Sequence, residues 1–186
     1  KGHINRNAIL LQGRRHQFSI SVAQVSQNRY ISEHSYTGDF SAFLALVEQS
    51  YKKAPFYTDV FPIIQSVALG DDQNVARKNS KSVVDVFSYL GISRDFIFSS
   101  NISMDREYKA QEKILKICQS LSINQYRNAI GGKAIYSPEK FHAQGVEIKF
   151  IETHPHTYSQ GVLDFTPYLS MIDVLMHCDK DAVRHL

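Results

Sequence analysis

The densest run of polar and aromatic side chains lies near the C-terminus, between Tyr158 and Asp173. Tyr158 and Gln160 begin it, and Ser170 and Asp173 end it among apolar neighbours. A carboxylate in such surroundings is either paired or functional, because an unpaired buried charge is costly. A helix-surface position or a buried pair with an arginine would explain Asp173 without any chemistry. Ser170 lacks a Gly-x-Ser-x-Gly elbow, so it is not a hydrolase nucleophile by motif.

A second candidate group, Asn5-Arg6-Asn7, lies near the start of the chain. Three hydrogen-bonding side chains in a row suit a contact with an anion or a sugar, and the planar guanidinium of Arg6 matches a phosphate or carboxylate. The alternative is a turn held by local bonds from side chain to backbone. Both interpretations stay open.

The sequence Gly131-Gly132-Lys133 resembles a phosphate-binding loop at first sight. A Walker motif would need a glycine where Arg127 stands and a serine or threonine where Ala134 stands, so the motif is absent. Two glycines still allow the backbone to approach a ligand closely. A plain turn between two elements explains them equally well.

The histidines gather most densely at His154-Pro155-His156. Alternate residues of an extended segment project to the same side and could offer two nitrogens to a metal ion. No third ligand is specified by spacing, although His142, His177 and Cys178 are available. We therefore expect a polar loop here and no metal site.

Composition places these residues in a globular chain of 186 residues with 43% hydrophobic and 21% charged residues. Such a length predicts a single domain covering 1–186. A net charge of +3 is too small to argue for nucleic acid, and no apolar run approaches the length of a membrane span. Cys118 and Cys178 make no disulfide framework, which favours packed thiols and a cytoplasmic location.

The elements that must position the candidate residues alternate between strands and helices. Apolar residues 8–11, a turn at 12–15 and the alternation of Phe18, Ile20 and Val22 predict a β-hairpin. Three helices are predicted next, with Asp39 as the first N-cap and Gly91 after the last, over 40–51, 56–69 and 72–90. Pro62 predicts a kink or two shorter pieces.

The second half of the chain continues the alternation. The patterns predict, in order, a strand at 94–98, a helix at 107–121, an ambiguous segment at 123–130, a helix from Ser137-Pro138 to Gly145, a strand at 146–150 and a helix opened by Thr166-Pro167. Interleaved strands and helices predict an α/β fold, a layered mixed sheet flanked by helices, with α+β as the alternative.

Several short motifs, in order along nearly the whole chain, resemble the WbqC-like family. They are Asn5-Arg6-Asn7, Tyr51-Lys52-Lys53-Ala54-Pro55-Phe56, Tyr126-x-Asn128-x-x-Gly131-Gly132-x-x-x-Tyr136, Phe141-x-x-x-Gly145-Val146-x-Ile148-x-Phe150, Tyr158-x-Gln160 and Phe165-x-Pro167-x-Leu169-Ser170-Met171-Ile172-Asp173. Relatives usually carry an earlier strand with a Gln-Pro-x-Tyr-x-Pro-x-x-Gly-Tyr-Phe-like motif, so we expect the native N-terminal segment to be missing from this sequence.

The resemblance implies work on a sugar nucleotide or amino sugar in bacterial surface polysaccharide and O-antigen biosynthesis, with transfer of an acyl or aminoacyl group such as glycine. The implied partner is a small molecule, neither nucleic acid nor cofactor is implied, and a homo-oligomer is left open. A non-catalytic binding or scaffold protein of the same pathway is the alternative. A nucleotidyltransferase is weaker, because it rests on the alternation of elements alone.

In the transferase hypothesis Asp173 is the candidate general base. The remaining candidates would bind substrate, with cations for anionic groups and glycines for close backbone approach. They are Asn5, Arg6, Asn7, Lys53, Gly131, Gly132, Tyr136, Tyr158, Gln160 and Ser170. If the protein is an enzyme, we expect Tyr158, Gln160 and Asp173 to converge with Gly131, Gly132 and Tyr136 on one cavity.

Overall fold

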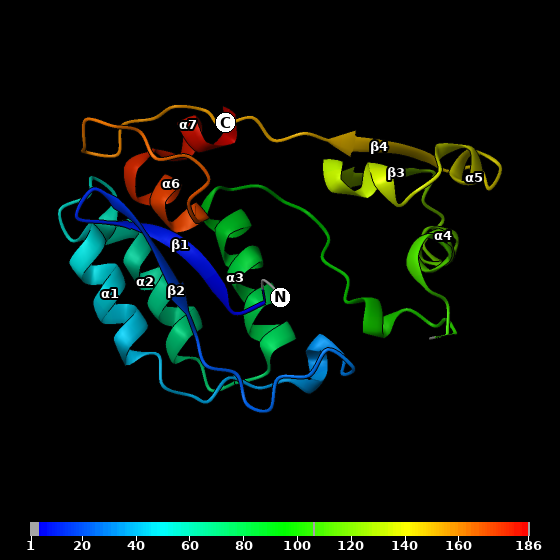
Figure 1. Cartoon of the computed structure of the whole chain (residues 1–186), viewed down its shortest axis with the longest axis horizontal. Coiled ribbons are helices and arrows are strands. Elements are labelled where there is room, and N and C mark those ends of the chain that lie inside the picture. The colour runs from blue at the N-terminus through cyan, green and yellow to red at the C-terminus, as the bar shows by residue number, and fades with distance from the viewer. Residues whose placement is uncertain (1–3, 106, 186) are drawn as a thin grey trace. The chain divides into compact units, whose positions relative to one another are not determined.

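The computed structural model of the chain describes residues 4–105 and 107–185 (Figure 1). The fold consists of two compact units. The first comprises Lys1–Arg94 and Pro155–Leu186, and the second comprises Asp95–His154. The single domain over 1–186 stays a prediction.

The first unit begins with the predicted hairpin. Strands β1 (Arg6–Leu11) and β2 (Arg14–Ser19) pair in antiparallel fashion, and Leu11 lies opposite Arg14. The two-residue turn needs positive φ at both positions, which Gln12 (50°) and Gly13 (73°) adopt. The turn is therefore tighter than the predicted one at 12–15, and the strands extend further toward it.

Three helices follow, as the apolar periodicity predicts. They are α1 (Ser41–Tyr51), α2 (Tyr57–Leu69) and α3 (Val75–Tyr89), preceded by the short 3-10 helix η1 (Ile31–Glu33). Helix α2 runs through Pro62 as one element, so the expectation of two shorter pieces is wrong. Val60 and Ala68, on either side of the proline, are both buried, and this packing stabilises both halves in one helix.

A side-chain cap explains where α3 begins, and a backbone conformation explains where it ends. The side-chain oxygen of Asn74 accepts a hydrogen bond from the Arg77 amide (3.2 Å), so the helix starts later than the predicted Asp72. Gly91 follows the helix with φ of +67°, the left-handed conformation that ends many helices, as predicted.

The last strong helix starts later than the sequence predicts. Helix α6 covers Met171–His177, and α7 (Lys180–His185) follows it. Thr166-Pro167 does not open a helix because Tyr168 has a positive φ of 57°, which is incompatible with a right-handed helix. Ser170 instead becomes the N-cap, its Oγ accepting from the Ile172 amide (3.3 Å) and its own amide donating to the Ala8 carbonyl of β1 (2.7 Å).

The core of the first unit joins these elements. One cluster gathers buried side chains of β1, α1, α2 and α6, together with Leu90 after α3: Ile9, Val47, Tyr51, Val60, Leu90, Leu175 and Met176. An adjacent cluster comprises Tyr36, Phe40, Ala68 and Val75. The hairpin is therefore held against the helices by apolar burial, and β1 contacts both α1 and α6.

The second unit is a smaller αβαβ arrangement. It contains the 3-10 helix η2 (Ser99–Asn101), then α4 (Ala110–Ser120), β3 (Gln125–Ala129), η3 (Ile130–Ala134), α5 (Pro138–His142) and β4 (Glu147–Ile151). Strands β3 and β4 pair in parallel, as the intervening helix requires. The ambiguous segment 123–130 thus contains a strand.

The predicted strand at 94–98 is wrong, because these residues have no regular structure. Phe96, Ile97 and Phe98 are 40–58% exposed, so this segment lacks the burial that a strand in a packed sheet would have. The α/β class itself is confirmed: helices accompany both antiparallel and parallel strands, each as a two-stranded pair. None of the helices in the described ranges has the length and apolar character needed to cross a membrane.

Candidate functional site

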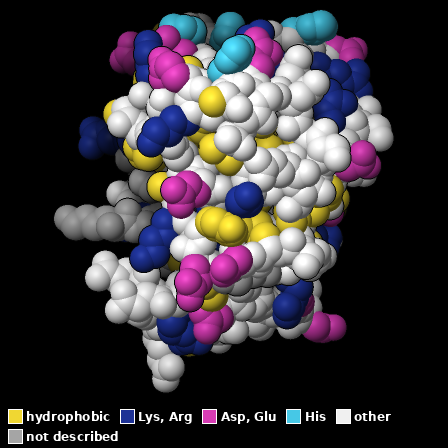
Figure 2. Space-filling model, turned by 90° about the vertical axis from the view of Figure 1, so that its right-hand side faces the viewer, with side chains coloured by type: hydrophobic (Ala, Val, Ile, Leu, Met, Phe, Trp, Pro, Cys, Tyr) yellow, Lys and Arg dark blue, Asp and Glu magenta, His cyan; other side chains and the backbone are white. Residues whose placement is uncertain are grey.

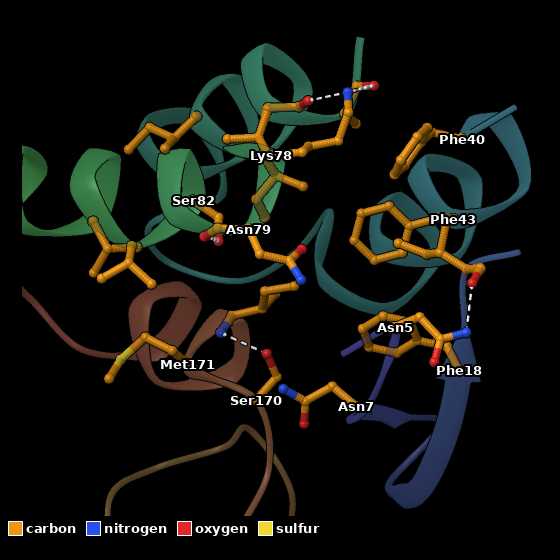
Figure 3. A pocket seen from close by; sticks show the side chains of 18 of the residues that line it. Asn5, Asn7, Phe18, Phe40, Phe43, Lys78, Asn79, Ser82, Ser170 and Met171 are labelled. Carbon is orange, nitrogen blue, oxygen red and sulfur yellow. Dashed lines mark hydrogen bonds between the residues drawn. The ribbon is translucent and has the colours of Figure 1, made fainter. Parts of the chain in front are cut away.

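The first unit contains a cavity of about 500 Å³, and four of the predicted substrate-binding residues line it (Figure 3). Asn5, Arg6 and Asn7 reach it from the hairpin, and Ser170 reaches it from the start of α6. Ser170 is more than 160 positions away from the other three residues in the sequence. They meet because β1 and α6 are joined by the hydrogen bond from Ser170 to Ala8.

Most of the cavity wall is apolar. Aliphatic and aromatic side chains come from β2, from α1 and the residue before it, and from α2, α3 and α6. They include Phe18, Phe40, Phe43, Ile63, Ile64, Val67, Val83, Val86, Phe87, Met171, Ile172 and Leu175. A largely apolar pocket with a few convergent polar groups is the usual form of a small-molecule site. The sequence did not single out these residues, since their pattern on each helix is also that of an ordinary core.

The predicted polar residues are held by backbone bonds. Asn5 Nδ2 donates to the Ile20 carbonyl (2.8 Å), and Asn7 Oδ1 accepts from the Ala8 amide (2.8 Å). The Asn7 bond is of the local kind that the turn hypothesis expected, whereas the Asn5 bond crosses the hairpin. These bonds fix both side chains at the cavity edge, and both carboxamides keep further hydrogen-bonding capacity for a ligand.

Lys78 also lines the cavity, but its charge is already satisfied. The side chain is 5% exposed, and Nζ donates to the carbonyls of Val67 (2.8 Å), Ala68 (3.0 Å) and Gly70 (2.9 Å) at the end of α2. Those three bonds use all three ammonium hydrogens. Burial lowers the pKa of Lys78 below its ordinary value. The residue therefore caps the end of α2, a role that its place beside Arg77 in the sequence does not reveal.

A second buried group closes the cavity beside Lys78. Tyr36 Oη donates to Asn79 Oδ1 (2.7 Å), and Asn79 Nδ2 donates to the Ile4 carbonyl (2.8 Å). Burial raises the pKa of Tyr36, so its hydroxyl stays protonated as a donor. Nothing in the sequence indicated this pair, because its members come from a loop and from the middle of α3.

Asp173 lies on a different side of α6 and is fully buried, with no exposed surface. Its Oδ1 accepts from Tyr51 Oη (2.8 Å), and its Oδ2 accepts from Tyr158 Oη (2.7 Å) and from Gln160 Nε2 (2.8 Å). Three of the predicted site residues thus meet as one cluster. Tyr51, its fourth member, was not among the residues predicted for the site. A buried carboxylate with three donors is stable in an apolar core.

The tyrosines of this cluster remain donors over the ordinary pH range. Burial is the main cause that raises the pKa of both Tyr51 and Tyr158, and their bonds to Asp173 raise it further. Tyr51 Oη also accepts from the Leu10 amide of β1 (3.0 Å). Asp173 therefore links α6 through Tyr51 to both α1 and β1, the strand that carries Arg6 and Asn7 to the cavity.

Gln160 holds the loop before α6. Its Oε1 accepts from the Thr166 amide (2.8 Å) and its Nε2 donates to the Thr166 carbonyl (3.0 Å), in addition to the bond to Asp173. The side chain is 4% exposed. Its carboxamide is used by the protein itself, and its contacts position the loop and the carboxylate.

Gly131, Gly132 and Tyr136 belong to the second unit. A Cβ added at Gly132 would lie 2.2 Å from Asn128 Nδ2 and 3.0 Å from the Tyr136 ring, whereas one at Gly131 meets open space. Tyr136 packs edge-on against Phe141, a buried core residue of that unit (5.9 Å between ring centroids). Close packing thus explains Gly132, and the convergence of these residues with Tyr158, Gln160 and Asp173 stays a prediction.

Lys53 is exposed beyond the end of α1 and does not line the 500 Å³ cavity. It borders a shallow hollow with Glu48, Gln49 and Lys52. The neighbouring Lys52 pairs with Glu48 (2.9 Å), and that bond is the main cause that raises the pKa of Lys52. A substrate-binding role for Lys53 stays a prediction.

Metal-ligating residues do not gather in the described part of the chain, where no three His, Cys, Asp or Glu side chains meet. His154 and His156 are exposed. Cys118 and Cys178 are free, buried thiols, as predicted, and burial raises the pKa of each. On the face drawn in Figure 2, basic and acidic side chains of the described residues are interspersed.

Comparison with known proteins identifies the family. Residues 1–185, nearly the whole chain, match the WbqC-like protein family. No curated protein and no solved structure matches the chain. The family match agrees with the resemblance carried by the short motifs, and the chain belongs to the WbqC-like protein family.

Proposed function

We propose that this protein is a cytoplasmic transferase that modifies an activated amino sugar in bacterial surface polysaccharide biosynthesis, including O-antigen, and that the modification is an acyl transfer. The observation that carries the proposal is the cavity lined by Asn5, Arg6, Asn7 and Ser170. Family membership supports the pathway, since the motifs that resemble the family include these residues.

The polar edge of the cavity suits the charged part of an activated substrate. The positively charged guanidinium of Arg6 is a planar fork of N–H donors whose geometry matches phosphate. Asn5 and Asn7 add carboxamides on either side of it, fixed by the backbone. Ser170 brings a hydroxyl from the facing helix N-cap. An anionic diphosphate would contact Arg6, and hydroxyls of the sugar would contact the asparagines.

The reaction would proceed by attack of the sugar amine on the carbonyl carbon of an activated acyl donor, an ester or thioester. A bond between nitrogen and carbon forms, and the bond from that carbon to the leaving oxygen or sulfur breaks. The leaving atom takes the electron pair and one proton from the nitrogen. The protein would contribute by holding both reactants close together in the orientation that the attack requires, which alone accelerates such reactions strongly.

Asp173 enters this proposal as a positioning residue. A general base must lie within hydrogen-bond reach of the proton that it removes. Asp173 is fully buried, and both of its oxygens accept bonds from the protein. Its contribution in the proposed reaction is to fix β1 and α6, and with them Arg6 and Ser170, around the cavity.

A non-catalytic binding protein of the same pathway is the second candidate. It is favoured by the absence of histidine, aspartate and glutamate among the described residues that line the cavity, which leaves no carboxylate or imidazole base there. In that case the cavity would bind the activated sugar without changing it.

Ligand-detected NMR on the full chain tests the proposal, with a panel of nucleotide-activated amino sugars and the same sugars without the nucleotide. We expect binding of the activated sugars, weakened by Arg6→Ala and unchanged by Arg14→Ala, an exposed hairpin arginine that does not line the cavity. Mass spectrometry after addition of an acyl donor then separates a transferase from a binding protein. The absence of Arg6-dependent binding to any activated sugar would overturn both candidates.

A further inference from the structure

The charges on the wall of the cavity bear on which acyl group the proposed transferase carries. Two lining residues are cations, Arg6 and Lys78, and none of the described lining residues is Asp or Glu. The ammonium hydrogens of Lys78 are all bonded to three carbonyls at the end of α2, and its positive charge remains. A group that enters the cavity therefore meets mostly apolar surface, neutral polar groups such as Asn79 and Ser82, and no carboxylate among the described lining residues.

A glycyl or other aminoacyl group carries an ammonium ion, which this wall does not suit. An ammonium that leaves water needs a carboxylate or several acceptors in return, and without them its transfer is strongly unfavourable. The side-chain acceptors here are already bonded in part: Asn79 Oδ1 accepts from Tyr36, and Asn7 Oδ1 accepts from Ala8.

A hydrocarbon chain suits the same wall. The lining includes side chains of α2 and α3 such as Ile64, Val67, Val86 and Phe87, together with Phe43 of α1. Each methylene that moves from water into such surroundings contributes roughly 0.8 kcal/mol. A volume of about 500 Å³ is far larger than a glycyl group needs.

We propose that this cavity binds an unbranched hydrocarbon acyl chain, with its carbonyl end at the edge formed by Arg6, Asn7 and Ser170, so that the transferred group is a fatty acyl group. This inference rests on the proposed function and names the substrate class of the same site. The chain lies among the apolar side chains of α2 and α3, and the activated carbonyl meets the sugar amine at the polar edge.

The first test compares two probes that differ only at the far end of the chain, decanoate and 10-aminodecanoate, by titration calorimetry on the full protein. We expect decanoate to bind and 10-aminodecanoate to bind on the order of 100-fold more weakly, because its terminal ammonium would lie in the apolar depth without a counter-charge. Equal affinity of the two probes, or no binding of decanoate, would overturn the inference.

The second test locates the chain with a fluorescent reporter. The protein contains no tryptophan, so an introduced one reports alone. Val83 lines the cavity and is 48% exposed, while its neighbour Val84 is 36% exposed and does not line it. We expect decanoate to shift the emission of the Val83→Trp protein and to leave that of Val84→Trp unchanged, and we expect Val83→Trp alone to weaken decanoate binding. No change for either variant, or the same change for both, places the chain elsewhere and overturns the inference.

Failure of this inference is distinguishable from failure of the proposed function. If activated amino sugars bind in an Arg6-dependent manner while decanoate does not bind, the fatty acyl group is wrong and the transferase proposal stands. If decanoate binds beside Val83 while no activated sugar binds, the chain site is supported and the sugar substrate is wrong.

Discussion

Helix α6 separates two polar regions that look alike in the sequence and differ in the structure. On one side Asp173 is fully buried, and its two oxygens accept three hydrogen bonds. On the other side Met171, Ile172 and Leu175 line a mostly apolar cavity that has a few polar groups on its wall. Buried polar groups that are fully bonded stabilise a unique packing, whereas polar groups at the edge of an apolar cavity remain able to bind a ligand.

The difference gives the two regions separate experimental signatures. Substitutions in the Asp173 cluster should change the free energy of unfolding first and function only as a consequence. Substitutions at the cavity edge should change ligand affinity with little effect on stability. The variants of Asp173, Arg6 and Gly132 below test whether each residue belongs to one class or the other.

The largest effect is expected for Asp173→Ala. The change leaves the hydroxyls of Tyr51 and Tyr158 and the amide of Gln160 without their acceptor in a buried site. Buried donors that lose a charged partner destabilise a protein by about 3–5 kcal/mol in total. Urea unfolding should show this loss, and Asp181→Ala, an exposed aspartate of α7, should change stability by less than about 0.5 kcal/mol.

A variant with Asp173→Ala that unfolds at the same urea concentration as the wild type but loses transferase activity would contradict this assignment. It would show that the carboxylate acts on the substrate and that the general-base hypothesis is right. Asp173→Asn refines the test, because it keeps the shape and one acceptor and should retain part of the stability.

Arg6→Ala is expected to change affinity without a comparable change in stability. Loss of one charge-assisted contact weakens binding by about 1.5–3 kcal/mol, or roughly ten- to a hundred-fold. Titration of a nucleotide-activated amino sugar, beside a thermal melt, measures both quantities. A large fall in melting temperature with intact affinity would assign Arg6 to the hairpin, and Arg14→Ala is the matched control for the loss of a positive charge.

The sequence predicted the local elements better than the partners of the polar residues. The hairpin at Gly13, the cap at Gly91 and the Ser137-Pro138 helix start depend on neighbours in the chain, and all are present. The bond between Asp173 and Tyr51 joins residues 122 positions apart, which no local pattern encodes. Lys78 likewise reads as a surface cation, because only the folded chain brings the end of α2 to it.

The start of α6 shows why the predicted site geometry differed. With a helix from Thr166, Ser170 and Asp173 would share one helical face. The left-handed backbone conformation of Tyr168 prevents a helix from starting at Thr166, and Ser170 becomes the N-cap instead. The serine therefore lies at the cavity edge while the carboxylate points into the core, so two residues predicted to act together lie in the two different regions.

A smaller effect is expected for Gly132→Ala. This variant tests whether Gly132 of the second unit affects stability, as the Asp173 cluster does, or ligand affinity, as the cavity edge does. The added Cβ would collide with Asn128 Nδ2 at 2.2 Å and crowd the Tyr136 ring. Moving these side chains costs about 1–3 kcal/mol. Gly131→Ala is the matched control, since its Cβ meets nothing within 4 Å. Equal stability of both variants, with ligand affinity lost only in Gly132→Ala, would make Gly132 a binding residue.

The smallest effect concerns Asp72, an exposed and bonded carboxylate that contrasts with Asp173. The guanidinium of Arg77 and the amide of Asn74 lower the pKa of Asp72 from 3.8 to about 2. A lowered pKa means that the folded state favours the charged form, so the contribution to stability is complete above about pH 4 and is lost as the pH falls toward 2.

Because both side chains of the pair are about half exposed, water and salt screen most of the attraction between Asp72 and Arg77. We expect Asp72→Asn to be slightly less stable than the wild type at pH 6 and equal to it at pH 2, in urea unfolding at low ionic strength. A difference that persists unchanged at pH 2 would show that the Asp72 side chain stabilises the start of α3 by its shape rather than by its charge.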